Sequence, residues 1–95
     1  MYLLAMAALS AVLTWTDNSD NEDGFRIYRQ LTGTNFIELS TVPTDVVTYS
    51  DPASQPGACY KVTAFNIVGE SGFSNTVCLP LPPMAPSGLQ AKPVK

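Results

Sequence analysis

Few side chains in this sequence could do chemistry, and cysteines and carboxylates dominate among them. The 95 residues include two cysteines and eight acids but no histidine. Zinc sites usually draw on histidines or on more cysteines, and Ser-His-Asp or Cys-His catalytic pairs need an imidazole base. No glycine-rich phosphate loop occurs either. The sequence therefore predicts a protein that is not an enzyme, with no catalytic residues, no cofactor and no metal site.

Acidic residues gather between Asp17 and Gly24, which suggests a calcium loop. When Gly24 is set at the glycine of an EF-hand, however, Ser19 and Gln30 fall at ligand positions where carboxylates are expected. Asp, Asn, Ser and Gly also favour turns, and these carboxylates follow one another in one loop instead of converging from two elements. We therefore expect a solvated turn here.

Alternating apolar residues on either side of this loop predict two strands that share a core. Leu13 and Trp15 lie on one face of a strand over residues 11–16, and Phe25 and Ile27 on one face of a strand over residues 25–30. Tyr28 lies on the opposite face of the second strand. It could be a platform on which a ligand stacks, but an exposed aromatic more often supports cross-strand pairs, and we favour that interpretation.

The rest of the chain repeats short apolar runs separated by turn residues, which is typical of an all-β protein. Further inward-facing core residues are predicted at Tyr49, Tyr60, Val62 and Ala64. The further strands are expected at residues 36–42, 46–50, 60–64 and 74–79, with a crossing loop at 51–57 and a hairpin connection at 66–73. Residues 1–9 are expected to belong to the fold, with Tyr2–Ala7 as its first strand, although Ala, Leu and Met also favour helix.

The register of the last hairpin predicts a disulfide bond. If the chain turns near Val68 and Gly69, Cys59 comes opposite Cys78 on the neighbouring strand. Two buried free thiols are the alternative, but the outward register of Cys59 favours the bond. In the chain-entropy model, a disulfide that closes a loop of this size stabilises the fold by about 3 kcal/mol. Disulfide use indicates an oxidising, extracellular location.

Several motifs resemble the fibronectin type III family, in the form found in bacterial secreted and surface proteins. They are the stretch Leu13–Arg29, Tyr49-Ser-Asp, the Pro56-Gly57 turn, the alternating Tyr60, Val62, Ala64 and Asn66, then Gly69 and Ser74-Asn75. The resemblance covers Leu9–Leu79 and implies a seven-stranded, immunoglobulin-like β-sandwich over residues 1–79, used for spacing, adhesion or binding. It also implies that Tyr60 is the family's tyrosine corner, whose hydroxyl bonds to the loop backbone.

The C-terminal sequence does not fit the same domain. Residues 80–85 form a proline-rich linker, which should be extended and semi-rigid. Residues 86–95 resemble the first strand of a fibronectin type III domain, with Leu89 and Ala91 alternating inward between Pro86 and Val94. The resemblance implies an opening strand whose own domain is absent, so we expect residues 86–94 to dock on another copy of the protein.

Charge and hydropathy argue against nucleic acid and membrane as partners. The net charge is −3 and the five basic residues are scattered, which argues against nucleic-acid binding. The apolar run at residues 1–9 is too short to span a membrane.

We expect a non-catalytic structural module at the cell surface that assembles head to tail, as a filament or surface fibre. The alternatives are a spacer in a longer tandem protein, or a module that binds glycans or proteins through residues 17–24, 51–57 and 66–73.

Overall fold

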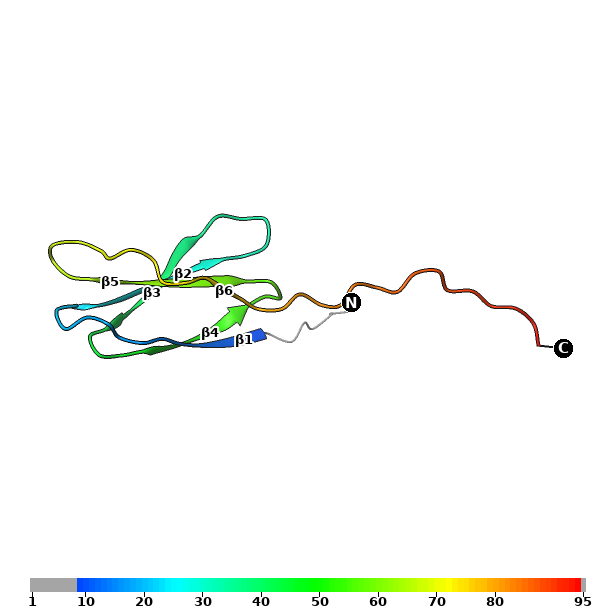
Figure 1. Ribbon diagram of the computed structural model, residues 1–95, viewed down its shortest axis with the longest axis horizontal. Helices are drawn as coiled ribbons and strands as arrows, with labels where there is room; N and C mark the ends of the chain where they lie inside the picture. Colours follow the sequence, from blue (N-terminus) through cyan, green and yellow to red (C-terminus); the bar gives the residue numbers. More distant parts are fainter. Residues whose placement is uncertain (1–8, 95) are drawn as a thin grey trace, which may run out of the picture.

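A computed structural model describes residues 9–94, which form two antiparallel β-sheets in a sandwich-like arrangement (Figure 1). A two-stranded sheet pairs β1 with β4, and a four-stranded sheet has the order β3-β2-β5-β6. The strands are β1 (Leu9–Thr14), β2 (Gly24–Gln30), β3 (Ile37–Pro43), β4 (Thr48–Ser54), β5 (Cys59–Phe65) and β6 (Val77–Cys78). The expected first strand, Tyr2–Ala7, lies outside the described residues. Within residues 9–94 no helix of the kind that crosses a membrane is found.

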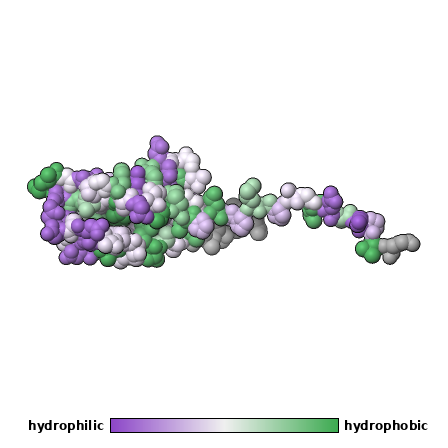
Figure 2. All heavy atoms as spheres, viewed as in Figure 1, coloured by the Kyte–Doolittle hydropathy of each residue, from purple (hydrophilic) through white to green (hydrophobic). Residues whose placement is uncertain are grey.

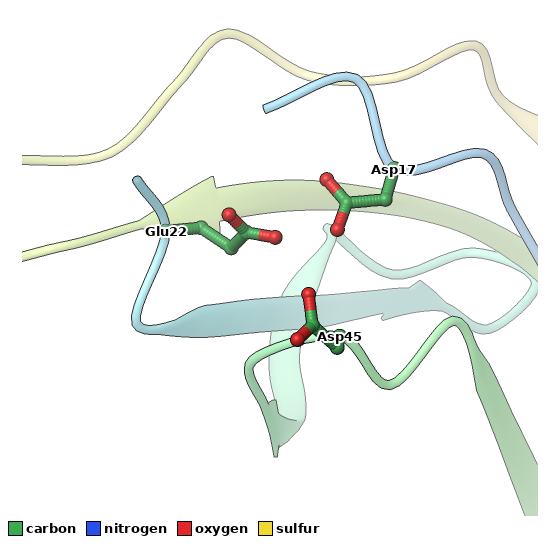
Figure 3. Close-up of side chains that lie close together, drawn as sticks. All are labelled: Asp17, Glu22 and Asp45. Carbon is green, nitrogen blue, oxygen red and sulfur yellow. The ribbon is translucent and has the colours of Figure 1, made fainter. Parts of the chain in front are cut away.

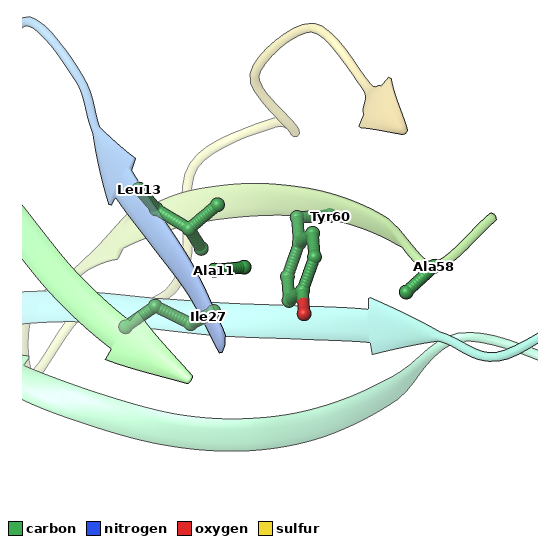
Figure 4. Close-up of a cluster of buried hydrophobic side chains, with 5 residues drawn as sticks. All are labelled: Ala11, Leu13, Ile27, Ala58 and Tyr60. Carbon is green, nitrogen blue, oxygen red and sulfur yellow. The ribbon is translucent and has the colours of Figure 1, made fainter. Parts of the chain in front are cut away.

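The core lies between the two sheets, where the alternating apolar residues meet. Its buried side chains are Ala11, Leu13, Ile27, Ala58 and Tyr60 (Figure 4). Of the other predicted core residues, Phe25 is buried, while Trp15, Tyr49, Val62 and Ala64 are only half-buried. Trp15 follows the end of β1 and packs edge-on against Phe25, with ring centroids 5.5 Å apart. The tryptophan therefore lies at the margin of the core and not at its centre.

The expected crossing loop at residues 51–57 is wrong for its first half, because β4 continues to Ser54. Pro52 has no N–H to donate to the partner strand, which is why the sequence suggested a break there. The pairing of β4 with β1 shifts register at this point, since Ala11 pairs with Asp51 but Leu9 pairs with Ser54. Pro52 thus lies at an irregularity where a ladder hydrogen bond is not required.

The last strand is shorter than expected, because β6 comprises Val77–Cys78 alone and not residues 74–79. Ahead of it, serine hydroxyls replace part of the ladder: Ser71 Oγ accepts the N–H of Ala64 at 2.9 Å, and Ser74 Oγ accepts that of Val62 at 2.9 Å. The β5 backbone is therefore satisfied without a regular partner strand over this stretch.

The predicted disulfide is confirmed. Cys59 pairs directly with Cys78 across β5 and β6, and the bond joins residues 19 positions apart in sequence. The connection between the two strands turns at Asn66–Gly69, whose terminal residues exchange backbone hydrogen bonds of 2.9 and 3.2 Å. The turn thus falls where the sequence placed it.

A buried polar network joins the two sheets. Arg29 follows Phe25 and Ile27 on the inward face of β2, and its guanidinium binds the Asp51 carboxylate of β4 at 3.0 Å. The Tyr60 hydroxyl donates to the same carboxylate at 2.6 Å and also bonds to Ser54 Oγ. The expectation that this hydroxyl bonds to the loop backbone is therefore wrong, because the side chains of two β4 residues, Asp51 and Ser54, occupy its hydrogen-bonding positions.

Side chains on the outer face of the four-stranded sheet pair with one another. The Tyr28 hydroxyl bonds to Glu70, and its ring meets the Phe73 ring edge-on. The Lys61 ammonium lies 4.1 Å from the centroid of Phe36 and 3.7 Å from that of Phe73. These aromatic surfaces are engaged within the protein, which agrees with the interpretation of Tyr28 as a cross-strand support.

Candidate assembly groove

One edge of β1 carries no partner strand among the described residues. β1 pairs with β4 along its other edge, and the four-stranded sheet ends at β6, whose Val77 lines the same groove as Val12 of β1. An unpaired strand presents a row of backbone N–H and C=O groups that can receive another strand. Val12 on this strand is 70% exposed.

A groove of about 610 Å³ runs between this edge and the β5–β6 side of the other sheet. Its apolar lining comes from both sheets and includes Leu13, Tyr60, Val62 and Val77. Trp15 lines it as well, and the buried indole Nε1 of this residue has no hydrogen-bond partner within residues 9–94. Buried N–H groups are nearly always paired in native proteins, so a carbonyl group of an incoming strand could supply the partner.

The C-terminal tail, residues 80–94, extends away from this body (Figures 1 and 2). Its root is fixed: the Leu79 N–H donates to the carbonyl oxygen of Ala58 at 2.8 Å, and the Gly57 N–H to that of Pro80 at 3.3 Å. Beyond the root the side chains are open to solvent, with Leu89 98% and Val94 96% exposed. The predicted assembly residues Pro86, Leu89, Ala91 and Val94 all lie in this exposed segment.

The direction of the strands relates the tail to the groove. Figure 1 shows β1 beginning near the end of the body from which the tail leaves and running toward the opposite end. A tail that entered from that opposite end would lie antiparallel to β1. The neighbour in a head-to-tail row would supply a tail in this direction, whereas the protein's own tail would have to reverse.

The three loops that were expected to bind a ligand do not gather at one place. Residues 17–24 and 66–73 lie at the end of the body opposite the tail, where Asn66 Nδ2 donates to the Asn21 carbonyl oxygen at 3.2 Å. The connection at residues 55–58 lies beside the tail root. The described geometry therefore gives no joint ligand surface formed by all three.

Three carboxylates lie close together (Figure 3), in loops at the end of the body opposite the tail (Figure 1). Asp17 and Glu22 come from the β1–β2 loop, and Asp45 from the turn between β3 and β4; one oxygen from each lies within 4.8 Å of the others. The hydrogen bond between the first two raises the pKa of the Glu22 carboxyl and lowers the pKa of Asp17. The sequence analysis did not include Asp45 among the clustered acids, because no sequence pattern indicates which loop a turn distant in sequence will contact.

No protein-family model matches this chain, and no curated protein matches it. The fibronectin type III resemblance therefore rests on the motifs themselves and stays a prediction.

Proposed function

We propose that the protein is a non-catalytic extracellular structural module of the fibronectin type III kind, which assembles head to tail through its C-terminal segment. Residues 86–94 of one copy add as a β-strand to the next copy, along the edge of β1 that has no partner strand among residues 9–94. The observation that carries this proposal is the presence, in one chain, of an inter-sheet groove and of an exposed tail with a strand pattern; the groove lies beside an edge of β1 that has no partner strand among residues 9–94.

The chemistry of strand addition fits both partners. Backbone groups of the tail pair with the β1 edge, while alternate side chains enter the groove and give specificity. Leu89 and Ala91 have the required spacing, and Leu13, Tyr60 and Val62 offer them an apolar surface. The Trp15 indole N–H, which has no hydrogen-bond partner among residues 9–94, gains an acceptor in the process.

The tail is long enough to cover the whole of β1. As a strand, residues 86–94 span about 30 Å at about 3.3 Å per residue, against about 20 Å for β1. The proline-rich linker at residues 80–85 is long enough to separate two bodies and too stiff to favour a tight reversal. A contact of this kind joins different surfaces of identical subunits and does not close on itself, so it builds an open row.

The disulfide supports an extracellular location, because such bonds persist in oxidising compartments. Solvent-exposed apolar side chains on the tail would favour aggregation in a free monomer, and docking removes them from water.

Truncation tests the proposal. We expect the full chain to form concentration-dependent oligomers in light scattering coupled to size exclusion, and filaments in electron micrographs. Deletion of residues 86–95 should leave a folded monomer at every concentration. A truncated protein that assembles with an unchanged length distribution would rule the mechanism out.

A matched pair of substitutions tests the strand geometry. Leu89→Asp places a charge on the face that enters the groove and should abolish assembly, whereas Gln90→Asp places the same charge on the opposite face and should leave assembly intact. Equal loss in both variants would indicate a surface contact without strand addition. A full chain that stays monomeric at all concentrations would favour the spacer function instead.

A further inference from the structure

Glu22 is a buried acid, and one of its two carboxylate oxygens lacks a hydrogen-bond partner among residues 9–94. The residue is 8% exposed, and its Oε1 atom is buried with no hydrogen-bond partner in the part of the chain that the structure describes. Figure 3 shows this carboxylate directed toward those of Asp17 and Asp45. A buried carboxylate oxygen needs a donor or a cation, since burial of an unpaired charge is strongly unfavourable.

Neighbouring basic residues do not supply that cation. The ion pairs found within residues 9–94 use Arg26 with Glu38 and Glu70, and Arg29 with Asp51. None of them includes a member of the three-carboxylate cluster. Like charges at this separation repel one another, so the cluster concentrates negative charge that a bound cation would neutralise.

The two loops are held in position without any ion. Thr44 Oγ1 donates to the Glu22 carbonyl oxygen at 3.0 Å, which ties the β3–β4 turn to the β1–β2 loop. The Ser19 N–H donates to Asp17 Oδ1 at 3.0 Å and fixes that carboxylate. Asp45 has a φ of 64°, a left-handed conformation that Asp and Asn tolerate better than most residues. The carboxylates are thus presented by a preformed backbone.

We propose that Asp17, Glu22 and Asp45 bind one calcium ion. The three side chains offer only oxygen, which suits a hard cation and not zinc, whose sites favour nitrogen and sulfur. Calcium accepts ligands of irregular geometry from loops, with water completing its shell, whereas magnesium demands a near-ideal octahedron. This site is separate from the groove and the tail, and the inference goes beyond the assembly function.

Bound calcium would link the two sheets at this end of the body. The β1–β2 loop and the β3–β4 turn each cross from one sheet to the other, so an ion held between them joins both crossings. Calcium sites in extracellular modules have dissociation constants of about 10⁻⁴–10⁻³ M, and we take this range for the proposed site. We expect calcium to raise the unfolding temperature of the protein in the millimolar range.

Calorimetric titration with calcium chloride tests the site, with magnesium chloride as a parallel titrant. Asp45→Asn and Glu22→Gln should each weaken calcium binding at least tenfold. The matched control is Asp20→Asn, which removes the same charge from an exposed residue of the same loop outside the cluster. Its affinity should stay within about twofold of the wild type.

Thermal unfolding in chelator separates a metal site from a purely structural cluster. Asp45→Asn removes one of the repelling carboxylates, so without calcium its unfolding temperature should equal or exceed that of the wild type. With calcium, the unfolding temperature of this variant should not rise. The proposal is overturned if the wild type shows no calcium-dependent shift at 10-fold the upper expected dissociation constant, about 10 mM. It is equally overturned if Asp20→Asn loses as much affinity as Asp45→Asn.

Discussion

Arg29 occupies an inward position of β2, where the alternation of Phe25 and Ile27 suggests an apolar side chain. Its charge is tolerated because the Asp51 carboxylate, 1% exposed, meets it from the opposite sheet. Burial raises the pKa of Asp51, but the hydrogen bonds from Tyr60, Arg29 and the Ala53 N–H, together with the Arg29 charge, outweigh it and leave the pKa below its usual value. The network therefore favours the charged carboxylate in the folded state.

This network predicts that acid destabilises the protein through Asp51. Because the folded pKa lies below the unfolded value of about 3.9, the stabilisation is fully present above that pH and is lost as pH falls through the folded pKa. Asp51→Asn should lower the free energy of unfolding by about 3–5 kcal/mol at neutral pH, since it leaves the Arg29 charge buried and unpaired. It should also make the free energy of unfolding less dependent on pH in the acid range. Urea denaturation at several pH values measures both effects.

Glu38→Gln is the matched control, because it removes an acid from the half-exposed ion pair with Arg26. Such surface pairs contribute about 0–1 kcal/mol, so stability should change little. The role given to the network would be contradicted if Asp51→Asn were as stable as this control and if its stability fell with acid as that of the wild type does.

At the level of the elements, the disulfide compensates for a weak last strand. β6 contributes only Val77–Cys78 to the sheet, and irregular chain held by serine hydroxyls precedes it. Replacement of both cysteines by alanine should lower the free energy of unfolding by about 3 kcal/mol. Chemical denaturation measures the loss, and thiol titration of the denatured, unreduced wild type should find no free thiol. Two titratable thiols would show that the bond does not form.

Period-two alternation was enough to predict most of the strands and the direction of their side chains. The pairing of Cys59 with Cys78 also followed from the sequence, since a short hairpin fixes the register of its two strands. The end of β4 could not be predicted, because Pro52 is a break in an ordinary strand but is tolerated where the register shifts. Serine hydroxyls that replace ladder partners likewise leave no periodic signal.

The candidate sites were predictable to different degrees. The strand pattern of the tail could be seen in Leu89 and Ala91. The groove could not be predicted, because it depends on how the two sheets pack and on which edge of β1 has no partner among residues 9–94. Asp45 lies more than 20 residues from Glu22 in sequence, and only the fold brings them together. Arg29 did carry a signal, since a charge at an inward strand position requires a buried partner.

For the whole molecule, the two ends of the body differ in character. The tail leaves one end, while hydrophilic residues gather at the other, which holds the acidic loop (Figure 2). In the proposed assembly, the tail end of one copy faces the loop end of the next, so that each tail enters antiparallel to β1. A tail folded back on its own body would lie parallel to β1 instead.

Engineered cysteines distinguish these two arrangements. If Leu89 and Ala91 face the groove, Gln90 lies on the outer face of the added strand, the same face as the exposed Val12 of β1. The double variant Val12→Cys with Gln90→Cys should form a ladder of covalent oligomers under mild oxidation, visible on a non-reducing gel. Each single variant presents only one of the two partners and should give no ladder. A docked tail from the same chain would yield a cross-linked monomer of increased mobility, and that product in place of the ladder would overturn head-to-tail assembly.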